Sequence, residues 1–244
     1  ALVGRGDARI PVAVDSSATV AVAAAAHAEV LVDVDVGLPR CGCDVADAGA
    51  LADAARAAGL LVRGVMGYEG HLVGDPDRGR RADGVSASMA VLREAHHAVG
   101  GGIASAGGTG TYDLHDWADE VQAGSYLLMD THYARLGLPF RQALSVLSTI
   151  VSRSTKGWAV ADAGLKAFGM DHGDPTLPGA EVLFCSDEHT TLVAADGGEP
   201  LPAVGERVRF LPAHVDPTVA LHERMYLVDG DEVLDVWPVD LRNW

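Results

Sequence analysis

Hydrophobic and polar positions in the first part of the chain follow two alternating patterns, short apolar runs and alanine-rich stretches of helical periodicity. Five β-strands are predicted, at residues 10–15, 30–37, 61–67, 103–108 and 120–129. Helices are predicted at residues 16–28, 47–58 and 86–99, with a short helical turn near residues 115–118. This alternation is typical of a parallel α/β sheet or barrel, although five strands are too few to close a (β/α)8 barrel.

The pattern changes near Ala143. From Leu144 onward, β-branched runs are separated by turn sequences at residues 154–157, 196–198 and 229–231, and no long helical stripe follows. We therefore predict two domains, an α/β domain over residues 1–143 and a mainly antiparallel β-domain over residues 144–244.

Charge and composition narrow the class of protein. A net charge of −16 argues against nucleic acid or an anionic membrane as a partner, because phosphate binding requires clustered Lys and Arg. The sequence contains neither a signal-peptide pattern nor an uninterrupted apolar run of about 18 residues. Three cysteines, Cys41, Cys43 and Cys185, cannot all pair within one chain, so we predict reduced thiols and a cytoplasmic location.

Polar side chains recur just after the predicted strands, where parallel α/β folds build their sites. Arg40 follows the second strand, and Tyr68 and His71 follow the third. Any one of these alone is more often a cap or a packing residue. Their recurrence at successive strand ends favours a site.

Two loops rich in glycine and hydroxyl groups follow the fourth and fifth strands. They contain Gly107-Gly108-Thr109 and Gly124-Ser125-Tyr126. Backbone amides and Thr hydroxyls in such loops can bind a phosphate dianion, and we predict one phosphate site between them. The alternative is that both are ordinary turns.

The sharpest motif lies in the β-domain, at His214-Val215-Asp216. In a strand, His214 and Asp216 project to the same face, and this donor pair suits Mn²⁺ or Zn²⁺. The alternative is a plain His–Asp hydrogen bond on a strand surface. Glu188-His189 is a second polar pair that can face the same place, and Lys166 is either a surface residue or a cation facing the site.

Taken in order, these motifs resemble the D-threonine aldolase and D-serine dehydratase group, within the alanine-racemase-like class of pyridoxal-phosphate enzymes. The resemblance runs through segments 35–40, 67–71, 107–109, 124–126, 162–166, 188–189, 214–218 and 236–240. It implies a (β/α)8 barrel of the TIM type, a C-terminal β-domain, pyridoxal 5′-phosphate and a divalent metal, Mn or Zn, at His214 and Asp216.

The resemblance also implies roles for individual residues. Arg40 would lie near the phenolic oxygen of the cofactor, with Tyr68 or His71 beside the ring, and Lys166 and His189 are further catalytic candidates. Gln122 stands where related racemases place an arginine against the ring nitrogen. The residues expected around the phosphate are Gly107, Gly108, Thr109, Gly124, Ser125 and Tyr126.

The implied activity is a lyase that cleaves β-hydroxy-D-amino acids to glycine and an aldehyde, in a homodimer. The alternatives are a D-serine-type dehydratase, an amino-acid racemase, or a non-catalytic remnant. The group's Schiff-base lysine lies on the first barrel strand, about three βα units before Ile10, whereas this chain has only Lys156 and Lys166. We therefore expect the isolated chain to be inactive, and either the missing segment to exist as a separate piece or something else to cover the exposed strand edge.

Overall fold

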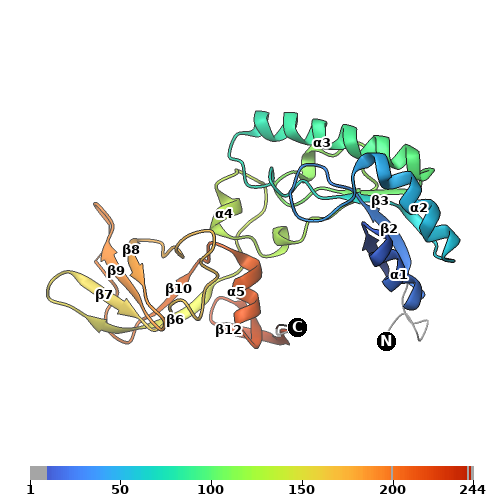
Figure 1. Cartoon of the computed structure of the whole chain (residues 1–244). Helices are drawn as coiled ribbons and strands as arrows, with labels where there is room; N and C mark the ends of the chain where they lie inside the picture. The colour runs from blue at the N-terminus through green and yellow to red at the C-terminus, as the bar shows by residue number, and fades with distance from the viewer. Residues whose placement is uncertain (1–9, 199, 241, 243–244) are drawn as a thin grey trace. The chain divides into compact units, whose positions relative to one another are not determined.

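The computed structural model describes residues 10–198, 200–240 and 242, and it separates them into two compact units that meet at the Gly124–Ser125 bond (Figure 1). The predicted boundary after Ala143 differs from this division. Residues after Gly124 pack with the second unit, because the amide of Val215 donates to the buried carboxylate of Asp130 and the amide of Thr131 donates to the Pro212 carbonyl.

The first unit contains a five-stranded parallel sheet in the order β1-β2-β3-β4-β5. Its strands are β1 (Pro11–Val14), β2 (Glu29–Asp33), β3 (Val62–Gly67), β4 (Ile103–Ala106) and β5 (Glu120–Val121). Its helices are α1 (Ser17–Ala25), α2 (Ala48–Ala57) and α3 (Arg78–Val99), with short 3₁₀ turns η2 (Val45–Asp47) and η3 (Tyr112–Leu114). The parallel sheet is confirmed, but a closed barrel is not shown in the described part of the chain.

The three helices lie on the same face of the sheet, since α1 contacts α2 and α2 contacts α3 (Figure 1). The core beneath them is made of small aliphatic side chains, including Val30, Val32 and Val65, which are all completely buried. The polar residues of the candidate site follow the C-terminal ends of these strands.

Helix caps explain two of the helix boundaries. Ser16 caps α1 and forms a reciprocal capping box with Thr19, as the hydroxyl-rich start of this helix predicts. The predicted start of the third helix at Ser86 was wrong, because α3 begins at Arg78, where the Asp77 carboxylate accepts from the Arg80 amide. The polar residues of its first two turns hide the helical periodicity.

The predicted strand over residues 120–129 was also wrong beyond Val121. The last ladder bond is donated by the Gln122 amide to the Ala106 carbonyl, and the chain then forms η4 (Ser125–Leu127) and α4 (Thr131–Ala134) in the second unit. The helical turn expected near residues 115–118 lies earlier, at η3.

The second unit is built on an antiparallel sheet in the order β10-β6-β7-β9-β8, which confirms the predicted β-domain. Its strands are β6 (Val146–Arg153), β7 (Trp158–Ala161), β8 (Ala180–Cys185), β9 (Thr190–Ala194) and β10 (Arg207–Phe210). Helix α5 (Val215–Leu221) and a hairpin of β11 (Arg224–Asp229) and β12 (Glu232–Pro238) follow. Phe168 and Phe210 pack edge to face in its core.

Across the residues that the structure describes, no helix combines the length and the apolar character needed to span a membrane.

Candidate functional site

Residues from three consecutive strand ends of the first unit contact one another in series. Arg40, which follows β2, places its guanidinium carbon 5.3 Å from the ring centroid of Tyr68, which follows β3. A Cβ atom added to Gly108, after β4, would lie 3.0 Å from Cε2 of the same ring. Arg40, Tyr68 and Gly108 therefore lie in series at the carboxyl ends of the strands, where ligands bind in parallel α/β folds.

His71 lies beside this series on the exposed surface. A Cβ atom on Gly37 would approach its Cε1 to 2.9 Å, and Gly37 has a φ of +120°, which favours glycine. Both residues line a shallow pocket together with Asp35 and with Ser88 of α3.

Gly107–Thr111, named here the glycine loop, joins β4 to η3. Gly107 has a φ of +81°, and a Cβ atom on Gly110 would lie 1.8 Å from the Val73 carbonyl oxygen. Glycine is therefore required at both positions. The Gly107 amide donates to Glu69 Oε2 at 3.2 Å, and the Gly108 amide donates to Thr111 Oγ1 at 3.1 Å. Both amides are thus occupied by acceptors within the protein.

The second predicted phosphate loop has a different setting. Nothing in the described structure lies within 4 Å of a Cβ atom placed on Gly124. Gln122 Nε2 donates to Ser105 Oγ at 3.2 Å. Ser125 and Tyr126 belong to the second unit, where Tyr126 packs against Phe140. A phosphate site between the two loops remains a prediction.

The HxD motif does not lie in a strand. His214 is the N-cap of α5, and Asp216 lies in the first helical turn. Pro217 favours this outcome, because proline is tolerated in the first turn of a helix and cannot donate to a strand ladder. The predicted proximity still holds, since His214 Nε2 lies 3.6 Å from Asp216 Oδ2.

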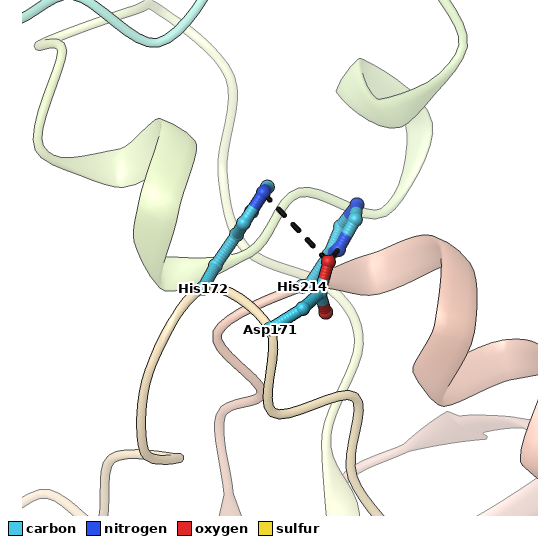
Figure 2. Close-up of side chains that lie close together, drawn as sticks. All are labelled: Asp171, His172 and His214. Atoms are coloured by element: carbon cyan, nitrogen blue, oxygen red, sulfur yellow. Dashed lines mark hydrogen bonds and ion pairs between the residues drawn. The ribbon is translucent and has the colours of Figure 1, made fainter.

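Two residues that the sequence did not predict complete a possible metal-binding group. His214 Nδ1 is 2.7 Å from Asp171 Oδ2, and the His172 ring stacks on the His214 ring with centroids 3.9 Å apart (Figure 2). One potential ligand atom from each of Asp171, His172 and His214 lies within 4.8 Å of the other two. Asp171 and His172 lie in a loop with no periodicity, so no sequence pattern marked them.

The electrostatics of this group favour a negatively charged acceptor beside His214. Partial burial raises the pKa of Asp171, but the hydrogen bonds from His214 and from its own backbone, with the nearby His214 and His172 rings, together hold the pKa below its ordinary value. An ionised carboxylate can only accept, so Nδ1 of His214 carries the hydrogen of this bond, and Nε2 lies on the side of Asp216. Ser125 Oγ also donates to Asp216 Oδ2, at 3.4 Å.

Lys166 and His189 lie on neighbouring segments of the second unit. The Lys166 amide donates to the Asp187 carbonyl, and its ammonium group forms an exposed ion pair with Glu188, which raises the lysine pKa. His189 is exposed just before β9. Their catalytic roles remain predictions, and Lys156 is likewise exposed, in the turn between β6 and β7.

Two family descriptions match the two parts of the chain. Residues 6–132 match "Alanine racemase, N-terminal domain", and residues 143–228 match "Putative serine dehydratase domain". The chain is 34% identical over 232 residues to 3-hydroxy-D-aspartate aldolase of Paracoccus denitrificans and 35% identical over 232 residues to D-threonine aldolase of an Arthrobacter species. These matches cover 85% and 86% of this chain and 58% and 59% of the relatives.

A solved structure shows the same arrangement of elements. The crystal structure of D-threonine aldolase from Filomicrobium marinum superposes with a TM-score of 0.87 at 32% identity, covering 95% of this chain and 69% of that one. The chain thus spans less than two thirds of the length of the two aldolases compared by sequence. It belongs to the D-threonine aldolase-like family of proteins with the alanine racemase fold.

Proposed function

We propose that this protein is a lyase that uses pyridoxal 5′-phosphate and a divalent metal to cleave β-hydroxy-D-amino acids, such as D-threonine, to glycine and an aldehyde. The observation that carries the proposal is the cluster of Asp171, His172, His214 and Asp216, named here the His214 group. Within it His214 Nε2 lies 3.6 Å from Asp216 Oδ2, and such a His–Asp pair can hold a metal at a substrate hydroxyl. The aldolase names of its relatives support the same reaction class. A homodimer in the cytoplasm completes the proposal.

The strand-end series of the first unit fits the cofactor. Arg40, Tyr68 and Gly108 contact one another in the order in which the phenolic oxygen, the ring and the phosphate of the cofactor follow one another. When bound, pyridoxal phosphate supplies an electron sink for the negative charge that develops at the substrate Cα. Arg40 would hold the phenolic oxygen and Tyr68 would lie against the ring. The glycine loop and Gly124 would hold the phosphate, and Gln122 would lie near the ring nitrogen.

The His214 group fits a divalent metal with nitrogen and oxygen ligands. His214 Nε2 and Asp216 would hold the ion, and Asp171 would orient the imidazole through Nδ1, as carboxylates do around metal-bound histidines. The metal would supply a Lewis acid that lowers the pKa of the substrate hydroxyl. His172, stacked on His214, keeps the ring in place and faces the same group.

The arrangement of the first unit supports a barrel. Its helices share one face of a parallel sheet, as in a (β/α)8 barrel, whereas doubly wound sheets carry helices on both faces. We propose that β1 to β5 are five of the eight barrel strands.

The test uses the full-length gene product with added cofactor and Mn²⁺. We expect acetaldehyde release from D-threonine, removed by a chelator and lowered at least about 100-fold by Asp216→Ala. Asp196→Ala, in an exposed turn after β9, is the matched control and should retain activity. Full activity of Asp216→Ala in chelator would reduce the His214–Asp216 pair to a structural contact. Elimination from D-serine without cleavage of D-threonine would make the protein a dehydratase.

A further inference from the structure

Glu69, which the proposed function does not use, lies completely buried directly beneath the glycine loop. Its Oε1 accepts from the Thr111 hydroxyl at 2.7 Å and contacts His115 Nε2 at 2.9 Å. Its Oε2 accepts from the Gly107 amide at 3.2 Å. One carboxylate therefore binds both ends of the loop and the residue that follows η3.

This contact set stabilises a charged carboxylate where burial alone disfavours one. Burial raises the pKa of Glu69, but the hydrogen bonds from His115 and Thr111 together hold it below its ordinary value. The His115 side chain is also completely buried, and its Nδ1 has no hydrogen-bond partner among the described residues. Because an ionised carboxylate can only accept, the Nε2–H of His115 donates to Glu69.

The loop's own bonds depend on the same carboxylate. Thr111 donates to Glu69 and can therefore accept from the Gly108 amide at 3.1 Å. The amides of Gly107 and Gly108 thus both have acceptors within the protein, Glu69 directly and Thr111, which Glu69 holds in place. The turn at Thr109 and Gly110 is held tightly as well, since Gly110 packs directly on the Val73 carbonyl. The loop keeps its shape without help from a ligand.

We propose that Glu69 is a positioning residue that preforms the glycine loop for the cofactor's phosphate, with Thr111 relaying its effect to Gly108. This inference rests on the proposed function, because it takes the loop as the phosphate site. It predicts a specific loss, in which variants at Glu69 weaken binding of the phosphate group and leave binding of the pyridine ring largely intact.

The experiment compares the equilibrium affinities of the full-length apoprotein for pyridoxal phosphate and for pyridoxal, which share the ring and the aldehyde. In Glu69→Gln, one carboxylate oxygen becomes an NH₂ group, which can only donate. It would face either the Gly107 amide or the donors from Thr111 and His115, so at least one of these hydrogen bonds is lost. We expect the ratio of the two affinities to fall roughly 10-fold, as for loss of a charged hydrogen bond. Thr111→Val should lower the ratio in the same direction, and Thr111→Ser, which keeps the hydroxyl, should restore it.

Leu51→Ala in α2 is the matched control, since it destabilises the same core away from the loop and should leave the ratio unchanged. If Glu69→Gln and Thr111→Val lower both affinities equally, or change neither, Glu69 is only a structural residue and the inference is overturned. If the wild-type protein itself does not prefer pyridoxal phosphate to pyridoxal, the phosphate site of the proposed function fails, and the inference fails with it.

Discussion

The two nitrogens of His214 face two different carboxylates, and the difference between them is testable. Asp171 contacts Nδ1 at 2.7 Å, whereas Asp216 lies 3.6 Å from Nε2. Asp171→Asn keeps an oxygen that accepts from Nδ1–H, so we expect Mn²⁺ affinity to fall about 10-fold. Asp216→Asn removes the charge of the proposed ligand and should weaken Mn²⁺ binding more. Isothermal calorimetry of the apoprotein with Mn²⁺ would measure both, and a larger loss at Asp171 would make Asp171 a direct ligand.

Asp33, at the end of β2, couples stability to pH. Burial, followed by repulsion from Asp15, raises its pKa to about 6. The folded state therefore holds this proton more tightly than the unfolded state, and the resulting stability is lost as pH rises through about 6. Asp33→Asn should leave the free energy of unfolding nearly unchanged at low pH and raise it by about 1 kcal/mol at neutral pH, allowing for solvent screening.

Urea unfolding at several pH values measures this difference. Asp196→Asn, in an exposed turn, is the control and should change the free energy of unfolding by no more than about 0.5 kcal/mol at any pH. A gain in stability for Asp33→Asn that is the same at pH 4 and pH 7.5 would contradict the assignment to a titrating carboxyl.

Single residues show how far sequence reasoning reaches. The spacing of His214 and Asp216 predicted their proximity, because both a strand and the first turn of a helix allow it. Asp171 could not be found in this way, since it comes from a loop 43 residues away in sequence. Glu69 was passed over for a similar reason, because its importance comes from contacts with Thr111 and His115, more than 40 residues along the chain.

At the scale of elements, capping and periodicity predicted α1 and α2 closely, and five short apolar runs located the parallel strands. The errors share one physical cause. Where local signals were weak, as at the start of α3 and after Val121, hydrogen bonds to the cap at Asp77 or from the Gln122 amide decided the boundary. The Asp77 cap is a local bond between residues three apart and the Gln122 bond joins two separate segments, but neither appears as hydrophobic periodicity.

The glycine loop gives a prediction at this scale. Gly110→Ala would place a Cβ atom 1.8 Å from the Val73 carbonyl, so backbone must shift, and we expect a loss of about 2–4 kcal/mol in the free energy of unfolding. Gly124→Ala meets no atom within 4 Å and is the matched control for stability, with an expected change within about 1 kcal/mol. Equal melting temperatures for the two variants would show that the backbone near Gly110 can shift at little cost in stability, which would contradict this prediction.

At the scale of the whole molecule, the described residues form two separate hydrophobic clusters, one in each unit. Leu92 is completely buried in the first and Phe210 in the second. Truncation of either to Ala should cost about 3–5 kcal/mol locally. Hydrogen exchange should then report faster opening of β2 and β3 in Leu92→Ala, and of β6 and β10 in Phe210→Ala. Identical exchange changes in both units for either variant would show that they unfold as one.

The hydrogen bonds that Glu69 and Thr111 make within the glycine loop also affect the rate and the entropy of ligand binding. A loop that already has its final shape orders little on binding, so the entropy change carries only a small conformational cost. Association would then follow simple bimolecular kinetics, with a rate proportional to ligand concentration and no plateau from a slow rearrangement. Selectivity among anions would then follow from how their size and geometry match the fixed loop.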